Sequence, residues 1–193
     1  MGKFFEDLNR VLVAGVVLAV VAFLILHLSG FTFDVYIKFI LRAIHVWFGI
    51  LWIGLLYYFN FVQIPSMPKI PDEQKPAVGK VIAPTALFWF RWAALATVVT
   101  GALLATMNSY IGQALMLQRP FTPIGIGMWL GLIMAFNVWF IIWPNQKKAL
   151  GIVTVTPEEK AKAARLAMLT SRANTMLSIP MLFCMVAQQN AGL

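Results

Sequence analysis

Charged residues are scarce in this chain. Only 11% of its 193 residues are charged and 61% are hydrophobic, whereas a soluble domain typically has about 25% charged residues. Seven residues are acidic, and none of them lies inside a long apolar run. The shortage of charge excludes an ordinary soluble domain. The lack of carboxylates in the apolar runs argues against a carboxylate proton relay and against a cation-coupled transporter.

Cysteine and histidine are also rare. The single cysteine, Cys184, excludes a disulfide framework, and no C-x-x-C-H string is present to attach a c-type haem. The only imidazoles are those of His27 and His45, so histidine chemistry has to involve one of them. There is no glycine-rich phosphate loop or nucleophile elbow. The sequence therefore leaves open whether the chain is an enzyme.

Long apolar runs are what the chain has in abundance. Each is long enough to cross a bilayer as a helix, and none alternates as a barrel strand would. We therefore predict an all-α fold and a single membrane domain over residues 1–193. No small-residue cleavage site follows the first run, so we expect that run to be a retained helix rather than a signal peptide. The five predicted transmembrane helices lie at about 11–28, 36–62, 83–107, 124–143 and 166–187.

Lysine and arginine flank these predicted spans unevenly. Three of them, Lys38, Arg42 and Arg119, lie on one side of a five-span chain. Because positive residues concentrate on the cytoplasmic side, we expect a cytoplasmic N-terminus and a periplasmic C-terminus. No basic stripe interleaved with aromatic residues is present, so we expect no nucleic-acid partner. The ten on the other side are Lys3, Arg10, Lys69, Lys75, Lys80, Lys147, Lys148, Lys160, Lys162 and Arg165.

His45 is the leading candidate for chemistry, because an ionisable group inside a bilayer is costly and usually functional. It lies in the predicted outer half of the second span. Haem b needs a neutral imidazole and room for a flat ring. Gly49, one turn along the same face, would give that room, and Trp52 could stack on the ring. His27, near the end of the first span, is a second possible ligand; the alternative for either histidine is a hydrogen bond to a neighbouring helix.

Two arginines lie near the predicted cytoplasmic face with no acidic partner in the spans. Arg91 is about two turns into the third span and Arg172 about two turns into the fifth. They could bind an anion, such as a haem propionate, a lipid phosphate or an anionic substrate, or they could extend to lipid headgroups. Asn137 adds an amide to the same half of the bilayer. A polar face on the fifth span is typical of contacts between helices; it consists of Ser171, Asn174 and Ser178.

Four strings resemble a known family. They are HVWFGILWIGLLYYFNFVQIP, RWAALATVVTGALL, GMWLGLIMAFNVWFIIWPNQKK and SRANTMLSIPMLFCM. They are similar to blocks of the N-terminal domain of bacterial membrane-bound urate oxidases (urate hydroxylases). The resemblance extends from about residue 36 to the end of the sequence. More distantly, the chain resembles haem-binding membrane protoporphyrinogen oxidases and copper-resistance D-type proteins.

The resemblance implies a redox-linked protein of the bacterial inner membrane. It implies haem b as a possible cofactor and urate or a related purine as the substrate. In this family the membrane domain is often followed by a periplasmic c-type cytochrome domain, for which this sequence has no C-x-x-C-H motif. The expected partners are the lipid bilayer and either a c-type cytochrome or other membrane subunits. The alternative is a non-catalytic transmembrane subunit of a larger respiratory or photosynthetic complex.

Overall fold

The computed structural model describes residues 2–26, 32–188 and 190, and their regular structure is entirely helical. The predicted all-α class is thereby confirmed. The chain divides into two compact units, Met1–Phe39 and Ile40–Leu193, each of which is described by itself. The prediction of a single membrane domain stays a prediction.

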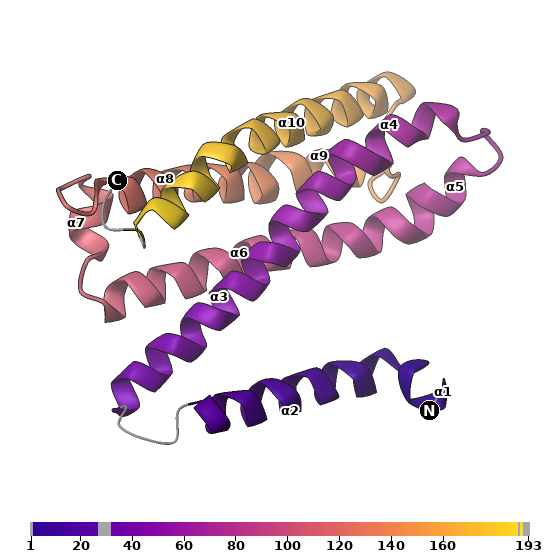
Figure 1. Cartoon of the computed structure of the whole chain (residues 1–193). Coiled ribbons are helices and arrows are strands. Elements are labelled where there is room, and N and C mark those ends of the chain that lie inside the picture. The colour runs from indigo at the N-terminus through magenta and orange to yellow at the C-terminus, as the bar shows by residue number, and fades with distance from the viewer. Residues whose placement is uncertain (1, 27–31, 189, 191–193) are drawn as a thin grey trace. The chain divides into compact units, whose positions relative to one another are not determined.

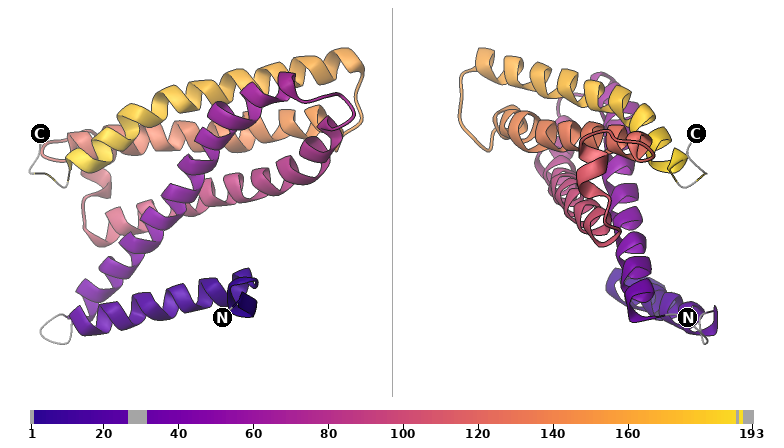
Figure 2. Two further views of the ribbon diagram at one scale, coloured as in Figure 1. Left: turned by 45° about the vertical axis from the view of Figure 1, so that its right-hand side comes forward. Right: turned by 90° about the vertical axis from the view of Figure 1, so that its left-hand side faces the viewer.

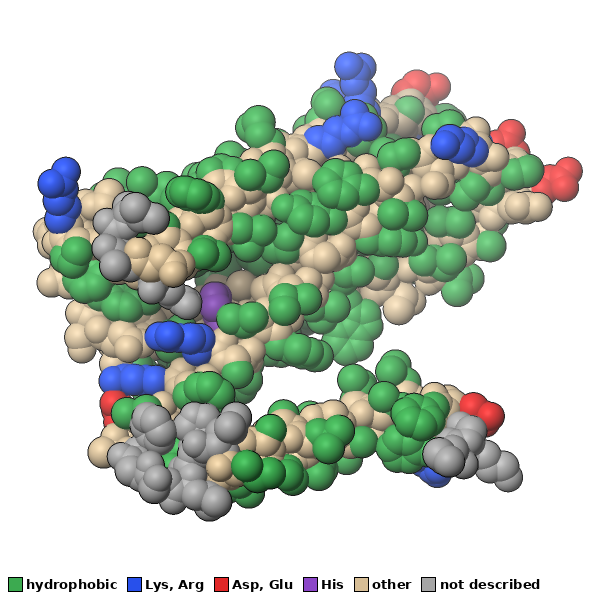
Figure 3. All heavy atoms as spheres, in the orientation of Figure 1, with side chains coloured by type: hydrophobic (Ala, Val, Ile, Leu, Met, Phe, Trp, Pro, Cys, Tyr) green, Lys and Arg blue, Asp and Glu red, His purple; other side chains and the backbone are tan. Residues whose placement is uncertain are grey.

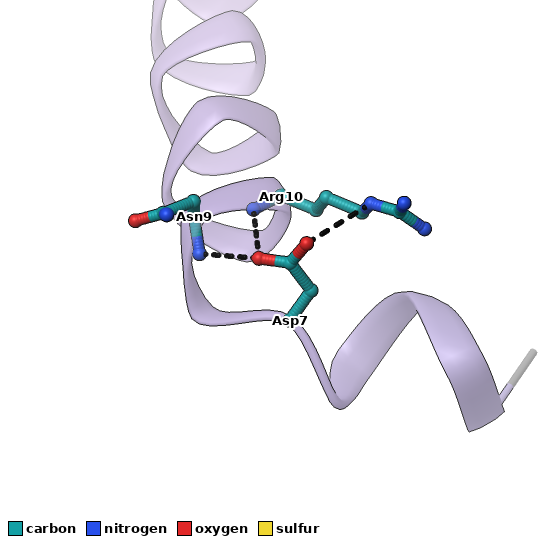
Figure 4. Close-up of polar contacts among 3 residues, drawn as sticks. All are labelled: Asp7, Asn9 and Arg10. Carbon is teal, nitrogen blue, oxygen red and sulfur yellow. Dashed lines mark hydrogen bonds and ion pairs between the residues drawn. The ribbon is translucent and has the colours of Figure 1, made fainter.

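The first unit contains α1 (Gly2–Phe5), α2 (Leu8–Leu26) and the start of α3 (Phe33–Tyr57). Helix α2 begins at Asp7, whose carboxylate accepts hydrogen bonds from the backbone N–H groups of Asn9 and Arg10 at 3.0 and 3.3 Å. The Arg10 Nε also lies 3.1 Å from Asp7 Oδ2, as Figure 4 shows. Inside the unit, the Phe23 ring contacts the rings of Tyr36 and Phe39. The predicted end of the first span, at residues 27 and 28, lies outside the described residues.

The second unit is built from long helical rods that run side by side (Figures 1 and 2). The first rod continues from α3 through the π-helical η1 (Tyr58–Gln63), α4 (Ile64–Ser66) and the 3₁₀ turn η2 (Met67–Lys69). The second consists of α5 (Lys75–Ala77), the π-helical η3 (Val78–Ile82) and α6 (Ala83–Met107). After the short α7 (Ile111–Leu115), the third consists of α8 (Thr122–Phe136), the π-helical η4 (Asn137–Ile142) and α9 (Trp143–Ala149). The last helix, α10 (Pro157–Ala187), begins at a capping box formed by Thr156 and Glu159.

Each of the three π-helical segments lies immediately before a proline-containing turn. The prolines are Pro65, Pro84 and Pro144. A proline ring in an α-helix clashes with the carbonyl four residues earlier and offers no N–H. Here the residue before each proline donates its N–H five residues back, as Ile64 does to the Phe59 carbonyl, and this wider turn accommodates the ring. Asn60 and Asn137, which belong to the polar network on α10 described below, lie in such wide turns.

Four helices in the described part of the chain are long and apolar enough to cross a membrane: Leu8–Ile25, Phe33–Lys69, Lys75–Met107 and Thr122–Ala149. They contain or overlap the first four predicted spans, and α6 has the predicted bounds 83–107. The predicted fifth span, 166–187, lies within α10, which is helical throughout but is not among the four. Arg172 and Asn174 lower the hydropathy of α10. The count of five spans and their orientation therefore stay predictions.

The core of the second unit lies where α3 and η1 meet α6, η4 and α10. Trp52, Leu56, Phe90 and Met134 are among its fully buried side chains. Large apolar side chains also cover much of the surface in Figure 3, and charged side chains gather near helix ends. An apolar exterior around an apolar core is what a helix bundle in lipid requires.

Candidate functional site

His45 binds α6 through one of its two ring nitrogens. Its Nδ1 lies 3.0 Å from the Thr97 carbonyl oxygen and 3.2 Å from Thr100 Oγ1. A carbonyl oxygen only accepts, so Nδ1 carries the proton and donates it to Thr97. In a neutral imidazole Nε2 is then left without a proton and keeps its lone pair. This is the hydrogen bond to a neighbouring helix that the sequence left open as the alternative to haem ligation. The ring is half-buried, and no partner for Nε2 is present among the described residues.

Gly101 allows the His45 ring to lie directly against α6. A Cβ at position 101 would be 2.8 Å from His45 Cε1 and 3.2 Å from Nδ1, closer than any normal side-chain contact. Glycine is therefore required for this ring position. Thr97, Thr100 and Gly101 were not predicted as site residues. Their spacing of three and four residues, which puts them on one face of the 83–107 helix, is the signal that could have identified them.

The two residues predicted to accompany His45 have different surroundings. A Cβ on Gly49 would lie 3.9 Å from Thr97 Cγ2, an ordinary van der Waals contact and the one neighbour within 4 Å among the described residues. Trp52 is 1% exposed and belongs to the apolar core, where its Nε1 has no hydrogen-bond partner among the described residues. The structure thus brings His45 and Gly49 to the same helix crossing, but Trp52 packs elsewhere.

Arg91 and Arg172 are not brought together by any described contact. The Arg91 guanidinium stacks on Trp143, with Cζ 3.9 Å from the ring centroid, and it lies 5.4 Å from the Phe88 ring. Arg172 is exposed on α10, with no ion pair or ring contact among the described residues. Arg91 therefore has an aromatic partner that the sequence did not reveal, since Trp143 is 52 residues away along the chain.

Asn137 belongs to a buried polar network centred on α10. Its Nδ2 donates to Asn174 Oδ1 at 2.8 Å, and Asn174 Nδ2 donates to the Met134 carbonyl at 2.9 Å. One turn earlier on α10, Ser171 Oγ accepts a hydrogen bond from Asn60 Nδ2 at 2.8 Å. The contacts between helices that were predicted for the polar face of the fifth span are present.

The same network continues one turn further along α10. Ser178 Oγ lies 3.0 Å from the Tyr57 hydroxyl and donates to the Thr175 carbonyl at 2.7 Å. Ser178 and Asn174 are fully buried. Amides and hydroxyls that hydrogen-bond between helices fix how helices pack in a membrane, so this network holds α10 against α3, η1 and η4.

The candidate site is thus one imidazole with a free nitrogen rather than a cluster of ligands. His27 lies outside the described residues. Within the described ranges, no group of three or more His, Cys, Asp or Glu side chains could hold a metal ion. A single imidazole whose Nδ1 donates to a backbone carbonyl is the arrangement that metal-ligating histidines usually have.

The fold and this site define a helical protein with several helices able to span a membrane. Residues 118–191 match the family model described as urate oxidase N-terminal. This match, which covers α8 to α10, confirms the resemblance to the urate oxidase N-terminal family over those residues. No curated protein and no solved structure matches the chain.

Proposed function

We propose that this chain is a redox-linked membrane protein of the urate oxidase N-terminal type in which His45 would hold the iron of a haem b. The observation that carries the proposal is the hydrogen bond between His45 Nδ1 and the Thr97 carbonyl. It fixes the neutral tautomer with Nε2 unprotonated, which is the form that binds iron. The His45 residue is only half-buried, so its ring is not sealed inside the apolar core.

The residues present fit one axial ligand. His45 would hold the iron, the Thr97 carbonyl would orient the imidazole and raise its basicity, and Gly101 would keep the ring against α6. Haem b, when bound, supplies one-electron transfer. Gly49 lies at the same helix crossing as His45, and Trp52 is buried in the apolar core.

The proposed topology is five spans in the bacterial inner membrane, with α10 as the fifth. Two connections, residues 70–74 and 150–156, lie at the same end of the second unit, and α7 lies at the opposite end (Figures 1 and 2). The lysine-rich segments flank the first end, and Arg119 follows α7. This grouping supports a cytoplasmic first end. His45 would then lie in the periplasmic half, where a c-type cytochrome partner could exchange electrons.

Urate or a related purine is proposed as the substrate on the family match alone. Neither Arg91 nor Arg172 has an arrangement that selects a purine: one is stacked on Trp143 and the other is exposed.

An absorption spectrum of the purified protein, oxidised and then reduced with dithionite, tests the haem proposal. We expect a Soret band in the wild type and its loss or marked shift in His45→Ala. His27→Ala is the matched control, because it removes the only other imidazole and separates one axial ligand from two. A wild type that is folded, supplied with haem and still colourless would overturn the proposal.

A second candidate is a non-catalytic subunit of a larger membrane complex. It is favoured by the closed hydrogen bonding of the α10 network, which leaves that part of the core with a structural role, and by the wide apolar surface. Co-purification at fixed stoichiometry with a larger complex, together with a colourless His45 site, would favour this candidate over haem binding.

A further inference from the structure

A small internal cavity lies among η1, α6, α9 and α10. It offers about 30 Å³ of room for water centres, and one water needs roughly 10–15 Å³ by the same measure. Its apolar wall includes Phe59 and Phe90, both buried. Its polar wall is formed by Gln63, Gln146 and Ser171. The cavity is therefore large enough for one or two waters and too small for a cofactor.

One buried oxygen atom on the wall of this cavity, and a second about one turn away, have no donor among the described residues. Gln63 Oε1, on the cavity wall, is inaccessible and has no hydrogen-bond partner among the described residues. Asn60 Oδ1, one turn earlier on η1, is in the same condition. Leaving a buried acceptor without a donor is costly, so such atoms in a polar cavity usually bind water.

Ser171 supplies a matching donor on the same polar wall. Its oxygen already accepts a hydrogen bond from Asn60 Nδ2, which leaves the hydroxyl proton to donate. A water beside it would accept from Ser171 and donate to Gln63 Oε1, and Gln146 offers a further amide on the same wall. Each group on the polar wall would then have a partner.

We propose that this cavity is a built water site, with one or two ordered waters bridging Gln63, Gln146 and Ser171. These waters extend the hydrogen-bonded network of α10 from Asn60 and Ser171 toward the lysine-rich end of the second unit. The site is separate from His45, and it stands whether or not the chain binds haem.

Hydroxyl-radical footprinting of the whole protein in detergent micelles tests the site, because radiolysis generates radicals from bound water inside a protein. We expect Phe59 and Phe90 to be oxidised several-fold faster than Met134. Met134 is fully buried and does not line the cavity, although methionine is the more reactive side chain. Oxidation of Phe59 and Phe90 no faster than that of Met134 would overturn the proposal.

A matched pair of substitutions locates the water. Gln63→Met removes the orphan acceptor at similar volume, and we expect oxidation of both phenylalanines to fall to the level of Met134. Gln188→Met makes the same change at another buried, unpartnered amide oxygen that does not line the cavity, and it should leave both rates unchanged. Unchanged rates in Gln63→Met would contradict the proposal. If that variant does not fold, Ser171→Ala, which removes the donor, is expected to lower the rates in its place.

Discussion

His45 and Asn174 are polar side chains inside the same helical unit, but they differ in how many of their polar atoms are hydrogen-bonded. Asn174 is fully buried, and its amide both donates to the Met134 carbonyl and accepts from Asn137. His45 is half-buried and fixed to α6 through Nδ1, while Nε2 is left over. The hydrogen bonds of both side chains offset the cost of placing a polar group among apolar ones. Of the two, only His45 keeps an unused lone pair, on Nε2, away from the hydrogen bond that Nδ1 makes with Thr97.

This difference separates a structural polar group from a candidate ligand. A closed amide pair has no capacity left for a cofactor, and its removal should affect stability alone. Replacing a histidine that has one free ring nitrogen should lower the stability of the fold only modestly, but it should abolish the binding of an iron held by that nitrogen. Substitutions at the two places should therefore separate stability from spectral change.

The largest loss of stability is expected for Asn174→Ala. It leaves the Asn137 amide without an acceptor and opens a cavity in the core, so we expect the free energy of unfolding to fall by roughly 3 kcal/mol. Unfolding in mixed micelles with increasing SDS measures this loss. In the double variant Asn137→Ala/Asn174→Ala no amide is orphaned, so the total loss should be less than the sum of the two single losses. Strict additivity would show that the two amides are not coupled.

A smaller loss, about 2 kcal/mol, is expected for Gly101→Ala, because the new Cβ would overlap the His45 ring. Gly49→Ala is the matched control on the facing helix. Its Cβ makes only ordinary contact with Thr97, and alanine favours the helix, so its melting temperature should equal or exceed that of the wild type. Equal melting temperatures for the two variants would contradict the close contact at Gly101.

The helices were predictable from the sequence because their cause is local. A run of apolar residues long enough to cross a bilayer needs no distant partner to be helical, and the predicted span 83–107 has the bounds of α6. Ser171, Asn174 and Ser178 share one face for the same local reason, so their burial against other helices followed from the spacing.

The partners of the candidate residues were not predictable, because they depend on where helices cross. A histidine in an apolar run does not indicate which carbonyl its Nδ1 will reach, and the Thr97 carbonyl has no side-chain signature. Arg91 carried a visible charge, but its contact with Trp143 depends on the packing of α6 against α9. The room expected at Gly49 was an inference from one helix alone, and it stays a prediction, since a Cβ there would make one ordinary contact with Thr97 of α6.

Arg91→Gln extends the comparison to a charge held by an aromatic ring. The guanidinium stacks on Trp143, and a cation–π contact is worth about 1 kcal/mol, so we expect a loss of that size in unfolding free energy. Arg172→Gln, at an exposed arginine of α10, should change stability less. The same unfolding assay compares the two variants, and equal losses would mean that the stacking contributes nothing.

The smallest loss of unfolding free energy is expected at an ion pair that is exposed to water. Asp72 and Lys75 form an ion pair in the connection between η2 and α5, and the hydrogen bond and charge of Lys75 lower the pKa of the Asp72 carboxyl below its ordinary value. A lowered folded-state pKa adds stability above the unfolded-state value, and this is lost as the pH falls through the folded-state value. Lys75→Ala should return the pKa of Asp72 toward its ordinary value and lower the unfolding free energy at neutral pH only slightly, because solvent screens this exposed pair. Carbon-13 NMR of labelled aspartate across acid pH measures the change in the pKa of Asp72, with Lys80→Ala as the control.

The unfolding assay completes the comparison. If Lys75→Ala lost as much unfolding free energy as Asn174→Ala, the loss would come from breaking a polar pair as such, and not from leaving a polar group buried without a partner.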